Sequence, residues 1–204
     1  MSASPWLPKP TLHGEKVLLR PPVREDAWPI AQLLADEELL RFTGSVSSAA
    51  EAAAFPQQPT EEIVEWYSSR ADIDGRLDLV IVDAATDEPV GESVLNDWDP
   101  VARSANFRIL LGPSGRDRGL GTEAIRMTVG YGFEHVGLHR IELGVYAYNP
   151  RAIRAYRKVG FVVEGTRRDA FRYLTAEGEI WTDEIVMSIL ASEWETHRGR
   201  PASV

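Results

Sequence analysis

The chain has 204 residues, of which 44% are hydrophobic and 26% charged, so we expect residues 1–204 to form a single domain with flexible ends at 1–14 and 195–204. Its net charge of −9 argues against nucleic acid or an anionic membrane as a partner, and its lack of cysteine excludes disulfides and a cysteine nucleophile. No apolar run approaches the roughly 20 residues that span a bilayer, and residues 1–10 do not resemble a signal peptide, so we expect a cytoplasmic protein.

The first half of the chain predicts three strands and two helices. Residues 17–19 favour a short strand, and residues 24–40 carry apolar side chains at helical spacing. Residues 43–59, rich in Ser, Ala, Gln and Pro, are expected to form a mobile loop before a helix with Thr60 as its N-cap. Two β-rich runs separated by turn residues then predict an antiparallel hairpin. These runs are residues 77–82 and 90–95.

The second half alternates strands and helices between clear stop signals. One helix is expected to end at Gly137, and another to begin at Asn149-Pro150 and end at Gly160. The expected strands are residues 105–111, 140–146, 161–174 and 180–190, the last two joined as a hairpin, and residues 191–204 are expected to be a frayed tail. The total of about seven strands and four helices predicts a mixed α/β fold.

A glycine-containing loop, Arg116-x-x-Gly119-x-Gly121, lies between a predicted strand and a predicted helix. Its glycines allow a ligand to approach the backbone closely, and the unpaired N–H groups of the first helical turn bind anions. The sequence contains neither Gly-x-x-x-x-Gly-Lys-Ser/Thr nor a full Gly-x-Gly-x-x-Gly, which argues against a nucleoside triphosphate or a dinucleotide. A tight turn that simply requires glycine explains the loop equally well at this point.

Basic residues are concentrated on this loop and on the helix that follows Asn149, and the four histidines are scattered. His135 and His139 are four residues apart, but Gly137 between them should end the helix that could have paired them. We therefore expect no metal site. The basic residues are Arg116, Arg118, Arg151, Arg154, Arg157 and Lys158.

From about Glu15 to Trp194 the chain resembles the GNAT superfamily of acetyltransferases, and within it the RimJ/RimL-like branch, which acetylates protein N-termini and small amines. The glycine loop with its following residues Thr122-Glu123-Ala124 is similar to the superfamily's Gln/Arg-x-x-Gly-x-Gly/Ala element. Further matches, in the same order as in the family, are residues 139–143, 149–161, 164–168 and 183–190.

The resemblance implies a mixed, mostly antiparallel seven-stranded sheet flanked by about four helices, in which strand 105–111 splays from strand 140–146. It implies acetyl-CoA as co-substrate, with the pantetheine arm pairing with the main chain of the gap like an added strand. The implied pantetheine partners are Ile109, Leu110 and Leu111. The implied pyrophosphate site is the amides of Arg116, Asp117, Arg118, Gly119, Leu120, Gly121 and Thr122, and Asn149, Ala152 and Tyr156 would line the thioester end.

Acetyl transfer to an amine requires a neutral amine, a polarised carbonyl and a protonated leaving thiolate. The backbone N–H of Leu110 or Leu111 could polarise the carbonyl. Tyr156 is the candidate acid, because a phenol with a pKa near 10 can hydrogen-bond to a thiolate whose thiol has a pKa near 8.5, although core packing would explain the same residue. Asn149 is a candidate at the mouth of the gap and is also a helix N-cap, and the two roles are compatible.

The general base is harder to assign, because strand 105–111 contains no carboxylate where many members of the superfamily carry a glutamate. Glu92, Asp97 and Glu142 are candidates, each of which could equally be a solvated or ion-paired strand residue, and Glu92, acting through a water, is our nominal choice. A lysine-type amine is neutral about one part in 2,500 at pH 7, whereas an α-amine is neutral about one part in seven. An α-amino group of a protein, peptide or small molecule therefore needs less help from a base.

We expect direct attack of a primary amine on acetyl-CoA in a ternary complex. Two alternatives remain at this point: acetylation of a polycationic small molecule such as an aminoglycoside or polyamine, which the acidic composition would suit, and a non-catalytic acyl-CoA-binding or regulatory domain. A homodimer is left open. The aromatic residues Trp66, Tyr67, Trp98, Phe171 and Trp181 are candidates for an acceptor pocket and could equally belong to the core.

Overall fold

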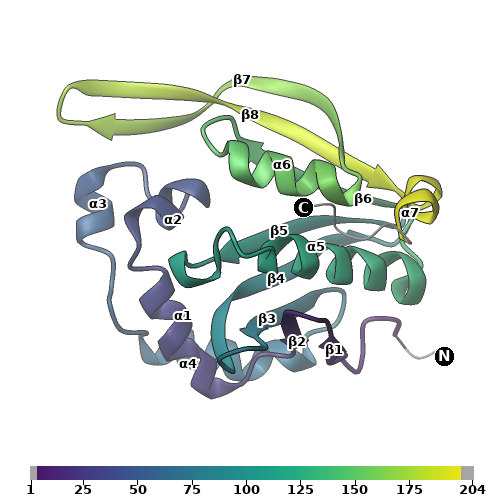
Figure 1. The fold of residues 1–204 in the computed structure, drawn as a ribbon. Coiled ribbons are helices and arrows are strands. Elements are labelled where there is room, and N and C mark those ends of the chain that lie inside the picture. The colour runs from purple at the N-terminus through teal and green to yellow at the C-terminus, as the bar shows by residue number, and fades with distance from the viewer. Residues whose placement is uncertain (1–3, 199–204) are drawn as a thin grey trace.

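The computed structural model describes residues 4–198, which form one mixed sheet with helices on both faces (Figure 1). Within these residues the sheet has eight strands in the order β1-β2-β3-β4-β5-β6-β8-β7, and every neighbouring pair is antiparallel except β5 and β6. The strands are β1 Leu12–His13, β2 Val17–Arg20, β3 Leu77–Asp83, β4 Glu88–Asp99, β5 Ser104–Leu111, β6 Arg140–Tyr146, β7 Val162–Thr175 and β8 Gly178–Leu190. The mostly antiparallel α/β class is confirmed, with β1 as the strand that the sequence analysis did not predict.

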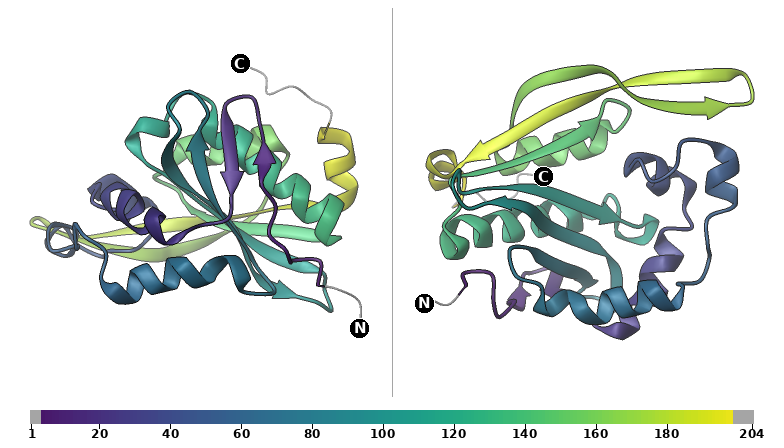
Figure 2. Two further views of the ribbon diagram at one scale, coloured as in Figure 1. Left: turned by 90° about the horizontal axis from the view of Figure 1, so that it is seen from below. Right: turned by 180° about the vertical axis from the view of Figure 1, so that it is seen from behind.

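Seven α-helices lie within the same residues, together with short 3-10 turns and a π-helical segment at Gly132–Val136. The α-helices are α1 Ala27–Leu33, α2 Glu37–Phe42, α3 Ala49–Ala53, α4 Glu61–Ser69, α5 Leu120–Tyr131, α6 Pro150–Val159 and α7 Ala191–His197. Figure 2 shows α4 on the opposite face of the sheet from α5 and α6. The long β7–β8 hairpin extends beyond the body of the molecule as an arm (Figures 1 and 2).

The local stop signals of the sequence act as expected. Thr60 caps α4 by accepting from Ile63 N at 3.3 Å, and Asn149 caps α6 by accepting from Ala152 N at 3.1 Å. Gly137 and Gly160 adopt left-handed backbone angles where their helices end. These boundaries follow from chemistry within a few residues, which is why the sequence reveals them.

The predicted helix at 24–40 is divided. A 3-10 turn at Arg24–Asp26 precedes α1, and α2 begins after Asp36. The Asp36 carboxylate accepts from Leu39 N at 2.8 Å, and this local bond starts a new helix in place of continuing the old one. In the predicted loop at 43–59, Ser48 caps the short helix α3 in the same way.

The described parts of the two expected flexible ends, residues 4–14 and 195–198, contain buried side chains or regular secondary structure. Trp6 is completely buried and its ring lies 5.7 Å from that of Trp98, while β1 pairs with β2. At the other end the expected tail forms α7, whose buried Trp194 donates from Nε1 to Glu134 Oε1 at 2.9 Å. Single large aromatic side chains anchor both segments, and no periodicity in the sequence signals such anchors. Residues 1–3 and 199–204 lie outside the described part of the chain.

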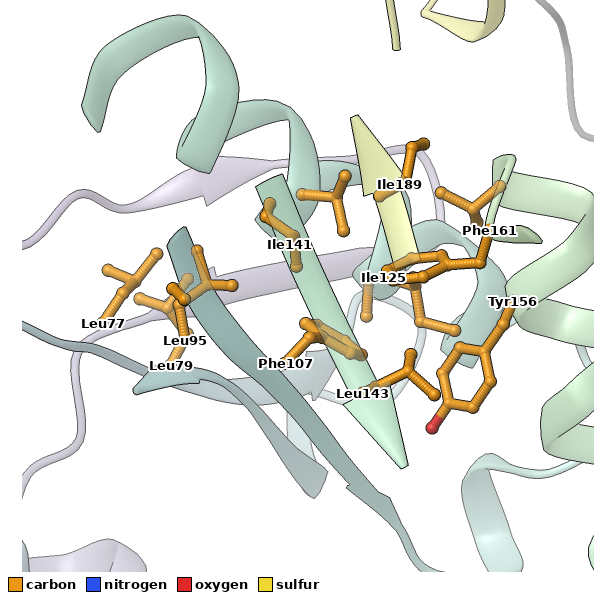
Figure 3. Close-up of a cluster of buried hydrophobic side chains, with 14 of the residues drawn as sticks. Leu77, Leu79, Leu95, Phe107, Ile125, Ile141, Leu143, Tyr156, Phe161 and Ile189 are labelled. Carbon is orange, nitrogen blue, oxygen red and sulfur yellow. The ribbon is translucent and has the colours of Figure 1, made fainter. Parts of the chain in front are cut away.

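The main core lies between the sheet and the helices α5 and α6, and Figure 3 shows a part of it. Ile125 from α5 and Phe161 after α6 pack with apolar strand residues such as Phe107 and Leu143. Tyr156 of α6 lies at the edge of the cluster beside Leu143, with its hydroxyl at the lower margin of the labelled side chains (Figure 3). A second, smaller cluster packs α1 against α4 on the opposite face.

Candidate functional site

Strands β5 and β6 separate in the middle of the sheet. They pair in parallel only where Ser104–Asn106 meets Arg140–Glu142. Beyond that point β5 continues with β4 as far as Leu111, and β6 continues with β8 as far as Tyr146. Each strand is therefore held by its outer neighbour, and the two diverge into a gap with unpaired backbone edges.

The backbone groups that face this gap can be assigned from the ladder. Gly112 N donates to Val90 O at 2.9 Å, and in an antiparallel ladder the residues that bond to the partner alternate along the strand. Leu110 therefore bonds toward β4, whereas Ile109 and Leu111 present their backbone groups to the gap. The Leu111 carbonyl accepts from Arg116 Nε at 3.2 Å on that side, which agrees with this assignment. Of the two carbonyl-polarising donors considered, the geometry favours the N–H of Leu111.

The glycine loop brings free amides to the mouth of the gap. Gly119 is the N-cap of α5 at a φ of 84°, a left-handed angle that a residue with a Cβ adopts only at a cost. Glu123 N is bonded to Gly119 O at 3.1 Å, so the N–H groups of Leu120, Gly121 and Thr122 precede the first intrahelical bond. A Cβ on Gly121 would lie 3.2 Å from the Leu111 side chain. The helix N-terminus thus packs directly against the end of β5 and suits an anion there.

The arginines of the loop are engaged with carboxylates. Arg116 donates to Asp36 Oδ1 at 2.8 Å and to Glu38 Oε2 at 2.5 Å, both at the start of α2. Arg118 donates to the buried Asp83 at 2.5 Å, and this ion pair lowers the pKa of that carboxyl. Since both guanidinium groups are paired, the backbone amides and the helix dipole are the groups of this loop that remain for an anion.

A further ion pair joins α6 to the same loop. Arg151 lies 3.1 Å from Asp117 Oδ2 and 3.7 Å from Glu38 Oε2. Together with Arg116, it ties the first turn of α2 to both sides of the gap. Basic residues on these two segments are evident from the sequence, whereas α2 as the source of their partners is not.

Helix α6 supplies the residues predicted for the thioester end. Asn149 caps it, Ala152 is partly buried against the main core, and Tyr156 is 6% exposed with its ring centroid 5.7 Å from that of Phe161. Burial raises the pKa of Tyr156 above its ordinary value of 10.0. A phenol with a raised pKa keeps its proton, so Tyr156 is suited to donating a hydrogen bond to a thiolate.

Glu92 lies on β4, on the face that α4 covers. Its neighbour Ser93 points to the other face and meets Thr128 of α5 at 2.7 Å. The Tyr67 hydroxyl donates to Glu92 Oε1 at 2.8 Å. Burial raises the pKa of Glu92 to about 7, against the lowering effect of the Tyr67 hydrogen bond and of Arg70. This carboxyl is therefore poised to change its protonation state near neutral pH.

The other two candidate bases have different surroundings. Asp97 is exposed at the irregular end of the β4–β5 pairing, where its carboxylate accepts from Asn96 Nδ2 at 3.2 Å. Glu142 is held in an ion pair by Arg140 at 2.8 Å, with its side chain 49% exposed. Of the three carboxylates, Glu92 combines burial with a pKa near neutrality.

The five aromatic residues suggested for an acceptor pocket do not form one wall. Trp66 is 42% exposed and carries the Arg70 guanidinium 3.4 Å from its ring centroid, and Trp98 packs on Trp6. Phe171 packs on Tyr146, and Trp181 is exposed on the arm. Tyr67 is the one whose hydroxyl reaches a candidate catalytic group.

An aromatic cluster that the sequence analysis missed lies where α2, β6 and the arm meet. Arg41 places its guanidinium 4.5 Å from the ring centroid of Tyr173 and 5.5 Å from that of Tyr148. Tyr148 stacks on Tyr146 at 5.6 Å and on Phe42 at 5.9 Å. Three segments far apart in the sequence contribute these rings, so no local spacing could have revealed them.

Two general features concern the whole described chain. Residues 4–198 contain no group of three or more His, Cys, Asp or Glu side chains arranged to hold a metal ion. None of the helices in this range combines the length and the apolar character needed to cross a membrane.

Comparisons with known proteins bear on the family and the fold. The family model of the acetyltransferase (GNAT) domain matches residues 16–162. Spermidine N(1)-acetyltransferase of Escherichia coli K12 is 32% identical over 156 residues, which cover 76% of this chain and 77% of that protein. The N-acetyltransferase p20 of Bacillus licheniformis is 27% identical over 186 residues, covering 90% of this chain and 98% of p20. The fold is similar to that of a spermidine N-acetyltransferase from Vibrio cholerae, solved with CoA and spermine, at a TM-score of 0.73 and 24% identity, covering 89% of this chain and 99% of the other.

Proposed function

Because the chain belongs to the GNAT acetyltransferase family and transfers an acetyl group from acetyl-CoA to an amine, we propose that its acceptor is a primary amine of a small polycation of the polyamine class. The net charge of −9 supports this proposal, since it attracts a multiply charged cation over several ångströms. The 32% identity to a spermidine N(1)-acetyltransferase supports it independently.

The observation that carries the chemistry is the gap between β5 and β6, with the amides of the glycine loop at its mouth. In the proposed mechanism the amides of Leu120, Gly121 and Thr122 hold the pyrophosphate of acetyl-CoA. The pantetheine arm pairs with the free edge of β5 at Ile109 and Leu111, and Leu111 N–H polarises the thioester carbonyl.

The amine then attacks the thioester carbonyl directly. Glu92 accepts the proton that the amine loses, through a water, and Tyr156 donates a hydrogen bond to the departing thiolate. A carboxylate with a pKa of about 7 is a stronger base than an ordinary glutamate, yet it is still half ionised at neutral pH. The sequence favours a weakly basic α-amine because strand 105–111 carries no carboxylate base. With Glu92 as the base, a more strongly basic alkylamine can also be deprotonated.

The proposal is tested by measuring CoA release with a panel of amines and acetyl-CoA binding by calorimetry. We expect kcat/KM to be highest for spermidine or spermine and at least ten-fold lower for an aminoglycoside and for a peptide with a free α-amine. A peptide that outperforms every polyamine would overturn the acceptor assignment. Tight acetyl-CoA binding without turnover on any amine would favour a non-catalytic role.

The catalytic base is tested on the same reaction with Glu92→Gln. The amide keeps an oxygen for the Tyr67 hydroxyl but cannot accept the proton, so we expect kcat to fall by about 10²-fold or more. We also expect the rise of kcat/KM with pH near 7 to disappear. A variant that keeps the wild-type rate and pH profile would exclude Glu92 as the base.

Acetylation of protein N-termini, the activity of the RimJ/RimL-like branch, is the second candidate. The observation that favours it is the 25% identity to YdaF of Bacillus subtilis over 183 residues, since the name of that protein refers to the ribosome. The peptide arm of the amine panel decides between the two.

We also propose that the protein acts in the cytoplasm and forms a homodimer. Light scattering of the purified protein tests the homodimer.

A further inference from the structure

Tyr67 and Glu92 form a partly buried contact between helix α4 and strand β4. Tyr67 is 4% exposed, and its hydroxyl donates to Glu92 Oε1 at 2.8 Å. No side chain or backbone group of residues 4–198 donates a hydrogen bond to the second oxygen, Oε2. One oxygen of the carboxylate is therefore fixed, and the other is free to accept a proton.

The position of the Tyr67 ring is itself determined by packing. It belongs to the cluster in which α4 packs on Ala27 and Ile30 of α1, and Leu110 of β5 packs against the same cluster. At the end of α4, Arg70 lies over the Trp66 ring. Arg70 is also 3.7 Å from Asp78 of β3. These contacts leave the hydroxyl little freedom to leave the carboxylate.

The charged groups around Glu92 come from each element packed on it. Asp78 on β3 disfavours the ionised carboxylate, whereas Arg70 at the end of α4 and Arg108 on β5 favour it. The Tyr67 hydroxyl favours the ionised form more strongly than any of these charges. Burial acts in the opposite direction and is the largest effect.

We propose that Tyr67 is a positioning residue for the acetyl transfer, which holds the Glu92 carboxylate in one orientation so that Oε2 is the oxygen that receives the proton of the amine. This inference rests on the proposed role of Glu92 as the base. Tyr67 itself touches neither substrate in this scheme. Its hydroxyl can donate to Oε1 before and after Oε2 is protonated, so the contact persists through the reaction.

The substitution Tyr67→Phe keeps the ring in its packed position and removes the hydrogen bond. The carboxylate then loses its one donor while remaining buried, so its ionised form becomes less favourable. We expect the pH at which kcat/KM rises to move upward by about one unit. At pH 7 this lowers kcat/KM by about five-fold, and the loss is recovered by pH 9 because the carboxyl is then ionised again.

A matched control is Tyr173→Phe. Tyr173 is also 4% exposed, and its hydroxyl donates to a glutamate, Glu37, at 3.1 Å. It lies in a different cluster, near α2 and α3, so we expect its loss to leave the pH profile unchanged. A general effect of deleting a buried phenolic hydroxyl would change both profiles alike.

A direct measurement separates this inference from the proposed base. With ¹³C-labelled glutamate, the carboxyl resonance that disappears in Glu92→Gln belongs to Glu92, and its titration can be followed in Tyr67→Phe. An upward shift of about one pH unit in both the titration and the rate profile is the expected result. If Glu92→Gln loses the pH-dependent rise but Tyr67→Phe titrates as the wild type does, the positioning role is overturned and the base stands. If Glu92→Gln keeps the wild-type profile, the base assignment fails, whatever the titration shows.

Discussion

The burial of Glu92 should cost the protein stability, and the substitution Glu92→Gln should recover it. Burial raises the pKa of this carboxyl from 4.5 to about 7. Between those values the unfolded chain releases a proton that the folded protein retains, so the folded state loses stability as pH rises. Below pH 4.5 the carboxyl is protonated in both states and the effect vanishes, whereas above pH 7 it is complete.

The size of the effect follows from the two pKa values. Each pKa unit corresponds to about 1.4 kcal/mol, so the full effect is about 3 kcal/mol above pH 7. Between pH 5 and pH 8 the expected change is about 2.5 kcal/mol, because part of the effect is already present at pH 5. Glutamine does not titrate and still offers an oxygen to the Tyr67 hydroxyl, so the variant escapes this loss.

Urea unfolding of both proteins at pH 5 and pH 8, at constant ionic strength, measures the difference. We expect Glu92→Gln to gain about 2.5 kcal/mol relative to the wild type between these two conditions. The comparison uses only the folding equilibrium, so it does not depend on whether Glu92 is the base. An equal stability difference at pH 5 and pH 8 would refute the reasoning that burial holds this carboxyl protonated.

Five further substitutions, at four positions, test the candidate site and its loop. Tyr156→Phe should lower kcat by about 10²-fold and leave the KM for acetyl-CoA unchanged, because the hydroxyl meets only the leaving thiolate; an unchanged kcat would remove Tyr156 from the chemistry. Gly119 and Gly137 have φ angles of 84° and 77°, so replacing either with alanine should lower the free energy of unfolding by about 1 kcal/mol in urea. Only Gly119→Ala should weaken acetyl-CoA binding, measured by calorimetry. Equal affinities of the two variants would argue against an anion site at the loop. Asn149→Ala should destabilise the protein by about 1 kcal/mol through loss of the N-cap and Asn149→Ser by much less, and equal losses would point to a role beyond capping.

The parts of the fold that the sequence predicts are those decided locally. Asn149 and Gly160 bound α6 through bonds that span three or four residues, and the glycine loop needs left-handed angles that its own residues supply. The chain order of strands and helices follows from such signals. For the same reason, the division of residues 24–40 was predictable in principle, since Asp36 is an N-cap residue.

The parts that escaped prediction depend on contacts across the chain. Trp6 packs against Trp98, and Arg116 forms an ion pair with Glu38. The sequence around Trp6 and Arg116 gives no indication of these partners. The same holds for Glu92. Its pKa is set by the fold that covers it, so the sequence offered it only as one of three carboxylates.

The gap between β5 and β6 is lined by backbone groups, which substitution leaves in place, and by side chains, which substitution replaces. The edge that Ile109 and Leu111 present to the gap consists of peptide groups, and every amino acid except proline carries the same ones. Side chains can therefore vary along this edge while its hydrogen-bonding pattern stays constant. By contrast, the contact between Tyr67 and Glu92 is made by two side chains, so a single substitution abolishes it. In the proposed mechanism, acetyl-CoA binding along this edge therefore tolerates more substitutions than the proton transfer does.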